Sequence, residues 1–185
     1  METKKAFERR LRDGWFDKFI TGNVIDIGCG VYGSFGVDPI TPDCERHDIH
    51  ICDAHTMDAY VDESYNTVYA SHILEHLQDP IKAIQNWWRL LIPGGCLVIS
   101  VPDRDSYERQ LTLPSRWNPD HKTMWVMDRK ESDNDYTFDL YDTVKAAIGD
   151  FKLEYYEKAV TCTNLDRPNE HGDGEYSIEI IARKL

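Results

Sequence analysis

The stretch 24-VIDIGCGVYGSFGVDPI-40 opens with a mostly apolar run, continues into Gly28-Cys29-Gly30 and reaches an acid at Asp38. A buried strand, a glycine-rich turn and then an acid is the usual start of a nucleotide-binding α/β unit. Gly28, Gly30 and Gly33 also satisfy G-x-G-x-x-G. In dinucleotide enzymes, however, the acid lies about 20 residues further on, after a helix whose N-terminus holds the pyrophosphate. Only seven residues separate Gly30 from Asp38. The stretch therefore favours an adenosine-containing ligand without a pyrophosphate over NAD or FAD.

Strand and helix patterns alternate along the rest of the chain. Further strands are predicted at 35–38, 49–54, 66–71 and 96–101, and helices at 3–20 and near 137–149. Another helix opens at Asp79-Pro80, an N-cap and first-turn pair, and stops before 93–95. Residues 151–160 and 175–184 read as an antiparallel pair of strands. The fold class is therefore α/β: a Rossmann-like, doubly wound, mainly parallel sheet with an antiparallel last strand, in a single domain of residues 1–185.

The first crossovers of this sheet are unusually short. About seven residues separate the first two predicted strands, and about ten separate the next two, whereas a parallel crossover normally needs a dozen or more. We expect shortened or missing crossover helices, which leave part of one sheet face bare. The N-terminal helix (1–21) is expected to cover that face or the mouth of the cofactor site, with the second subunit of a symmetric homodimer as the candidate cover for the remainder. The apolar stripe of this helix consists of Phe7, Leu11, Trp15 and Phe19.

Composition limits the partners and the compartment. A net charge of −12 and a pI near 4.9 disfavour nucleic acid, so a small-molecule substrate is expected. No apolar run approaches the roughly 18 residues of a membrane span, and the first residues lack a signal-peptide core. Five scattered cysteines without a C-x-x-C pair fit a reducing cytoplasm.

Polar groups follow the predicted strands at their carboxyl ends, where ligands bind to such sheets. The Gly28–Gly30 turn lets a ligand approach the backbone. Asp38 can accept hydrogen bonds from both hydroxyls of a ribose, and Asp53 can accept one from an adenine amino group. Ser71 and His72 follow the strand 66–71. Together these residues outline a pocket for an adenosine-containing ligand.

Five motifs in order extend this interpretation: VIDIGCG, FGVD, ICDA, NTVYASHILEHLQDP and WWRLLIPGGCLVISVP. They resemble the successive motifs of class I S-adenosylmethionine-dependent methyltransferases over about residues 22–102, closest to small bacterial and phage proteins with a truncated first crossover. The resemblance implies methyl transfer with S-adenosyl-L-methionine as cofactor. It places Asp26, Gly28, Gly30 and the Cys29 backbone around the methionine portion, Asp38 at the ribose, Asp53 and Ala54 at the adenine, and Ser71 and His72 at the sulfonium.

The segment 102–125 is polar, interrupted by prolines and rich in aromatic residues. Long irregular segments in compact domains are often lids, so we expect a substrate lid. A hydroxyl acceptor benefits from a general base. His121 is the first candidate and His72 the second, with Tyr107 and Arg116 as substrate-binding candidates and Glu108 beside them. Two alternatives remain: a protein that binds S-adenosylmethionine without transferring its methyl group, and a nucleotide-dependent oxidoreductase, which the short loop disfavours.

The motif 72-HILEH-76 also matches H-x-x-E-H, the inverted zinc-protease pattern. Zinc would need His72 and His76 on one helical face together with a further ligand. The segment 72-HILEHL-77 is predicted to form only one or two turns of helix, which end before Asp79-Pro80 and follow a strand of the cofactor site. Zinc hydrolysis is therefore disfavoured, and the sequence assigns no metal site.

Overall fold

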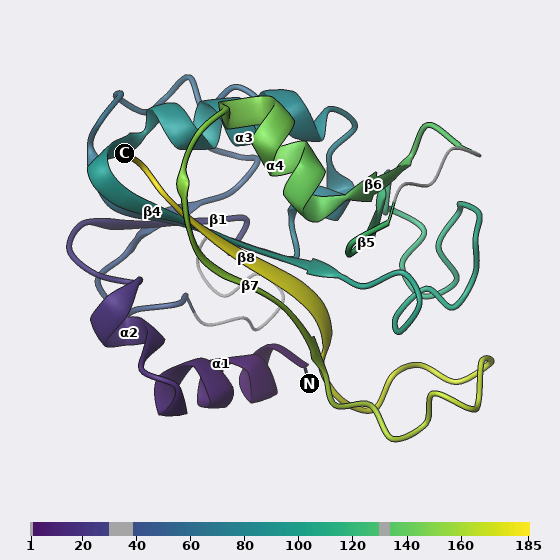
Figure 1. The fold of residues 1–185 in the computed structure, drawn as a ribbon. Helices are drawn as coiled ribbons and strands as arrows, with labels where there is room; N and C mark the ends of the chain where they lie inside the picture. Colours follow the sequence, from purple (N-terminus) through teal and green to yellow (C-terminus); the bar gives the residue numbers. More distant parts are fainter. Residues whose placement is uncertain (1, 30–38, 130–133) are drawn as a thin grey trace.

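A six-stranded sheet organises the computed structural model, which describes residues 2–29, 39–129 and 134–185 (Figure 1). The strand order is β2-β1-β3-β4-β8-β7. Strands β1 to β4 run parallel, whereas β8 is antiparallel to both β4 and β7. This confirms the predicted mainly parallel sheet with its antiparallel closing strand. The bounds are β1 Val24–Ile27, β2 Glu45–His47, β3 Tyr65–Ser71, β4 Leu91–Pro102, β7 Lys152–Val160 and β8 Tyr176–Arg183.

The register of β1 and β3 brings two predicted site segments together. All four residues of β1 are buried, as the apolar run predicts. Ile27 lies opposite Ala70 of β3. Gly28 directly follows Ile27, and Ser71 directly follows Ala70. Gly28 and Ser71 therefore reach the same edge of the sheet. Strand β8 is buried except at Arg183, because both of its faces are covered: Ile178 and Ile180 lie in the main core, and Ile181 packs in a second cluster with Trp15 on the opposite side.

Helices α3 (Pro80–Arg89) and α4 (Leu140–Ile148) pack on one side of the sheet (Figure 1). The predicted cap is present, since Asp79 Oδ1 accepts a hydrogen bond from Lys82 N at 3.0 Å. Ile84 and Trp87 of α3 are fully buried in the main core. Between β3 and α3 lies a single 3₁₀ turn, η2 (Leu74–His76). A small parallel pair of strands, β5 (Met124–Val126) and β6 (Thr137–Asp139), begins within the last two residues of the predicted lid.

The predicted strand at 49–54 is wrong. These residues form turns, and the strand beside β1 is Glu45–His47. The Asp48 side chain and carbonyl accept from His50 N at 3.1 Å and from Ile51 N at 2.9 Å. These local bonds close a turn where a strand would need its backbone groups for pairing. Ile49 and Ile51 consequently lie exposed. The predicted strand at 35–38 lies outside the described residues.

The predicted N-terminal helix is divided into two helices, and a different face of its first part is buried. Helix α1 covers Glu2–Arg12 and α2 covers Trp15–Lys18, with Gly14 between them at φ +75°. Phe7 and Leu11 of the expected stripe are 39% and 58% exposed, whereas Ala6 and Arg10 of α1 are buried. The left-handed residue breaks the helical periodicity, so the stripe does not continue onto one face.

This segment nevertheless covers the side of the sheet opposite α3 and α4 (Figure 1). Arg10 donates to Tyr69 Oη of β3 and to Glu179 of β8. The Trp15 ring packs against Tyr155 of β7, with ring centroids 4.9 Å apart. The cover is thus centred on β3, β8 and β7, further along the sheet than the sequence predicts.

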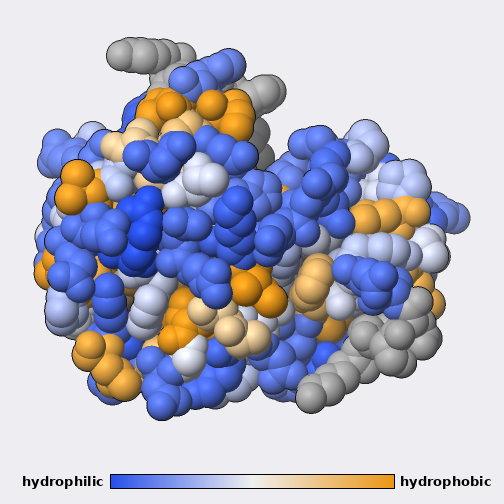
Figure 2. Space-filling model, turned by 90° about the horizontal axis from the view of Figure 1, so that it is seen from above, coloured by the Kyte–Doolittle hydropathy of each residue, from blue (hydrophilic) through white to orange (hydrophobic). Residues whose placement is uncertain are grey.

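The outer surface over α3 and α4 is mostly hydrophilic, with separate hydrophobic patches (Figure 2). In the described part of the chain, no helix combines the length and apolarity that a membrane crossing requires. The homodimer stays a prediction.

Candidate functional site

Gly28 forms the turn that ends β1. Its backbone φ is +81°, a left-handed conformation, and a Cβ there would lie 2.8 Å from Cγ1 of Ile73. Its N–H donates to His47 O of β2 at 3.1 Å. Only glycine combines this conformation with so close a neighbour. The turn therefore stays narrow, and it lies against the segment that follows β3.

Asp26 and Cys29 flank this turn. Asp26 is buried, and its Oδ2 accepts from Ile40 N at 2.7 Å. Burial raises the pKa of Asp26 to about 7, against the opposing effect of that hydrogen bond. Burial likewise raises the pKa of the Cys29 thiol to about 12. The thiol therefore stays protonated, which fits a packed group better than a nucleophile. Gly30 and Asp38 lie outside the described residues.

His47 holds the loop that contains Asp53 and Ala54 at the edge of the sheet where the Gly28 turn lies. The buried His47 ring bonds Cys52 O at 3.0 Å through Nε2, so the loop at 52–54 is held beside the Gly28 turn. Asp53 is exposed, and its Oδ1 accepts from His55 N at 2.7 Å and His55 Nδ1 at 2.8 Å. These bonds lower the pKa of Asp53. An ionised carboxylate at an exposed loop beside a glycine turn fits the adenosine half of the cofactor implied by the resemblance.

Ser71 and His72 follow β3. Ser71 is half-buried, and His72 takes a left-handed φ of +55°. The His72 N–H donates to Ser100 O at 2.8 Å, and its ring Nε2 lies 3.1 Å from Ser177 Oγ of β8. Its Nδ1 lies 3.5 Å from Glu75 Oε1. His72 is therefore held on both sides at the end of β3, next to the Gly28 turn.

His121 is buried and paired with a buried acid, Glu108. Its Nδ1 lies 2.6 Å from Glu108 Oε1. Because an ionised carboxylate only accepts, this bond places the ring proton on Nδ1 and the lone pair on Nε2. The segment is fixed by Lys122 N and Thr123 N, which donate to Glu75 O at 2.7 and 3.1 Å. His121 is thereby held over η2, directly after β3.

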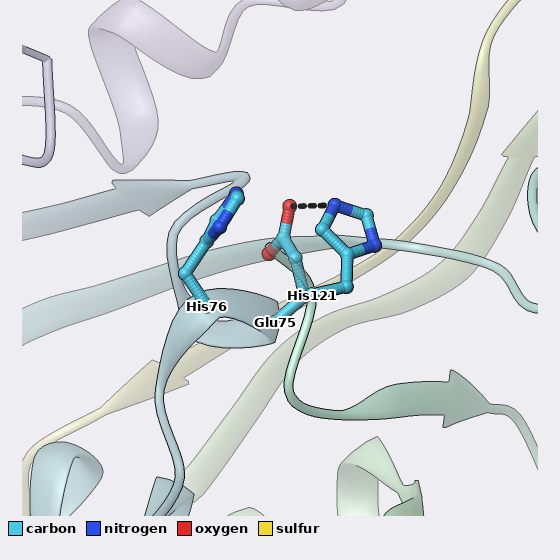
Figure 3. A group of neighbouring side chains, drawn as sticks. All are labelled: Glu75, His76 and His121. Carbon is cyan, nitrogen blue, oxygen red and sulfur yellow. Dashed lines mark ion pairs between the residues drawn. The ribbon is translucent and has the colours of Figure 1, made fainter. Parts of the chain in front are cut away.

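Glu75 and His76 of η2 complete the group around His121 (Figure 3). Glu75 is 1% exposed, and its Oε1 lies 4.0 Å from His121 Nε2. The His76 and His121 ring centroids are 4.9 Å apart. Since η2 is a single 3₁₀ turn, His72 and His76 do not form the i, i+4 pair of the H-x-x-E-H pattern. Glu75 is not among the site residues predicted from the sequence, where its only signal was its place in that motif.

The two substrate-binding candidates have different surroundings. The buried Tyr107 ring packs against Tyr176 at 4.7 Å and against His121 at 5.5 Å between centroids. Arg116 is exposed and donates to Pro168 O at 2.7 Å and to Asn169 Oδ1 at 3.1 Å. The fold therefore brings Tyr107 to His121, whereas Arg116 binds the connection between β7 and β8.

Three comparisons with known structures address the fold. A possible histamine N-methyltransferase from Thermotoga maritima matches with a TM-score of 0.59 and 17% identity, over 99% of this chain and 91% of that one. A putative S-adenosylmethionine-dependent methyltransferase from Listeria monocytogenes matches with a TM-score of 0.60 and 15% identity, over 99% of both chains. The cyclase SpnF matches with a TM-score of 0.58 and 16% identity, over 95% of this chain and 80% of that one. At these identities the likeness establishes the fold alone.

Two comparisons of sequence address the family. A curated ubiquinone biosynthesis O-methyltransferase from Paracidovorax citrulli is 29% identical over 124 residues, which are 52% of this chain and 51% of that protein. The chain thus spans about half the length of this relative. The model of a methyltransferase-domain family matches residues 3–134, well over half of the chain. The chain therefore belongs to the class I S-adenosylmethionine-dependent methyltransferases, and S-adenosylmethionine is the cofactor of this family.

Proposed function

We propose that this methyltransferase transfers the methyl group to a hydroxyl of a small molecule, and that activation of this hydroxyl depends on His121. The observation that carries the proposal is the buried Glu108–His121 pair at the end of β3. Support also comes from the relative from Paracidovorax citrulli, which is described as an O-methyltransferase. The net charge of −12 supports a small acceptor over a polyanionic one.

The chain's residues divide into a cofactor half and an acceptor half. In this proposal the backbone around Gly28 holds the methionine portion, Asp53 lies beside the adenosine, and Asp38 is the ribose ligand. His72 and Ser71 stand between the two halves. The bound cofactor supplies a methyl group activated by a positively charged sulfur.

Acceptor activation falls to His121. Glu108 holds the ring proton of His121 on Nδ1. Nε2 of His121 is therefore the basic nitrogen, which can take up the proton of the acceptor hydroxyl. Tyr107 packs beside that ring, and the segment 102–125 closes over it as the proposed lid. Such a lid would exclude water from the reacting groups. It would also hold the acceptor hydroxyl in line with the methyl group. His72 is the second candidate for the same task.

The test combines binding and turnover. Titration calorimetry should show binding of S-adenosylmethionine and of its demethylated product, and no binding of NAD. Release of the demethylated product is then followed over a panel of hydroxylated small molecules. For the best acceptor, His121→Ala should lower turnover by about 10²–10⁴, the usual contribution of a general base, with cofactor affinity unchanged.

The exposed His50 provides the control, since His50→Ala makes the same change at a histidine whose ring lies beside Asp48 on the surface. It should turn over like the parent. Undiminished turnover by His121→Ala would move the role to His72, and cofactor binding without turnover of any acceptor would favour a protein that does not transfer the methyl group.

A further inference from the structure

The group Glu75, His76 and His121 has the composition and arrangement of a metal site. Each residue offers one ligand atom, and these atoms lie within 4.8 Å of one another (Figure 3). The three side chains come from two segments, since Glu75 and His76 belong to η2 and His121 to the segment 102–125. We propose that they bind one divalent cation of the zinc type.

The hydrogen bonds of the two histidines support this proposal. His121 Nδ1 bonds Glu108 at 2.6 Å, and His76 Nδ1 bonds Asp120 at 3.0 Å. A carboxylate on one ring nitrogen fixes the tautomer and leaves the other nitrogen as a ligand, the arrangement that metal-binding histidines almost always show. Both histidines of this group are therefore prepared to ligate through Nε2.

The charges of the buried carboxylates supply an independent observation. Glu75 and Glu108 are each 1% exposed. Within the described ranges, Glu75 Oε2 and Glu108 Oε2 are buried without a hydrogen-bond partner, and no lysine or arginine forms an ion pair with either side chain. Buried carboxylates are normally paired or bound to a metal. A divalent cation beside Glu75 would provide the missing positive charge.

The ligand types favour zinc over magnesium or calcium. Two imidazoles and one carboxylate suit zinc and its first-row neighbours, whereas magnesium and calcium prefer oxygen ligands. With bonds of about 2.0–2.1 Å, neighbouring ligand atoms around tetrahedral zinc lie roughly 3.3 Å apart. Glu75 Oε1 and His121 Nε2 are 4.0 Å apart. Small rotations of the side chains, above all of the half-exposed His76, would close the group around the cation.

Three protein ligands leave a fourth position open, which is typical of catalytic rather than structural zinc. At that position an acceptor hydroxyl can bind and become more acidic, losing its proton to solvent and keeping the electron pair for the new bond to carbon. This role rests on the proposed function and changes one part of it, because His121 then acts as a ligand instead of taking up the proton. The binding of the cation itself does not depend on the proposed function.

The first experiment measures binding without turnover. The full chain is treated with a chelator, dialysed and titrated with zinc chloride by calorimetry, with magnesium chloride as the comparison. We expect one zinc per chain and no comparable response to magnesium. Cobalt(II) should give a visible spectrum of nitrogen and oxygen ligation. No stoichiometric binding, or a thiolate-to-cobalt band that places the metal on cysteine, would overturn the proposal.

Variants then locate the site. His76→Ala and His121→Ala should each lower zinc affinity by more than the 10–100-fold expected for Glu108→Ala, which removes only the partner of a ligand. The exposed His50→Ala should bind zinc like the parent. His76 is partly exposed, so its replacement by alanine should leave the fold intact and report on zinc binding alone. Circular dichroism verifies the fold of each variant. Unchanged affinity in both ligand variants would refute the assignment.

Turnover distinguishes this inference from the proposed function. If methylation of a hydroxyl acceptor persists at the full rate in chelator, the proposed function stands and the role of the cation fails. Loss of turnover in chelator, restored by zinc, is the expected result.

Discussion

Replacing Arg10 by methionine tests what holds the N-terminal segment on the sheet. Arg10 is 2% exposed and donates to Tyr69 Oη and to Glu179, which is fully buried in β8. Methionine keeps an unbranched chain in this space and removes the charge. Glu179 would then depend on Arg9 alone, whose Nη2 lies 2.8 Å from both carboxylate oxygens.

The expected loss follows from these contacts. Breaking a buried ion pair by removing one partner costs about 3–5 kcal/mol, and because Arg9 remains we expect the lower part of this range, about 3–4 kcal/mol. For a chain of this size, 1 kcal/mol corresponds to roughly 2–4 °C in Tm. Arg10→Met should therefore melt roughly 6–16 °C below the parent, and urea unfolding followed by circular dichroism gives the free energy.

Arg12 offers a matched control on the same helix, since its side chain is 71% exposed and, among the residues that the structure describes, pairs only with Asp13. Arg12→Met should stay within about 0.5 kcal/mol of the parent. The double variant Arg10→Met with Glu179→Met should be less destabilised than the sum of the single variants, because neighbours in one network couple by about 0.5–3 kcal/mol. If Arg10→Met unfolds like Arg12→Met, or if the double variant is additive, the buried pair does not hold the segment.

Three further changes address the cofactor half of the site. Asp26 has a pKa of about 7 in the folded chain, so the folded state keeps its proton longer than the unfolded state does. The contribution of Asp26 to the free energy of unfolding should fall by up to about 1.4 kcal/mol per pH unit as the pH rises from 4 to 7. The difference in unfolding free energy between Asp26→Asn and the parent, measured by urea unfolding at a series of pH values, should change with this slope. Gly28→Ala should destabilise more than Gly94→Ala, because both glycines have positive φ but only Gly28 lies against Ile73; equal melting temperatures would contradict the close contact. Asp38→Ala should weaken S-adenosylmethionine binding by about 1.5–3 kcal/mol, and parental affinity in calorimetry would exclude Asp38 as the ribose ligand.

The sequence by itself determined those elements whose signals are local. The mostly apolar run of β1 predicts a strand buried on both faces, and all four of its residues, Asp26 included, are buried. Asp79-Pro80 predicts the start of α3, because a side-chain cap and a fixed φ act within one helical turn. The order of these elements, together with the antiparallel pair β7 and β8, was enough for the fold class.

Tertiary structure decided the features that depend on distant partners. Glu45–His47 has no apolar pattern, and it forms a strand because its backbone pairs with β1. The next residues form a turn because Asp48 O accepts a hydrogen bond from Ile51 N. Arg10 is buried because Glu179 and Tyr69 bind it, although its charge predicts exposure. Glu75, Glu108 and His121 are scattered along the chain, and only the folding of 102–125 onto η2 brings them together. Backbone periodicity and capping act over a few residues, whereas a buried group of charges forms only after the sheet has placed its segments side by side.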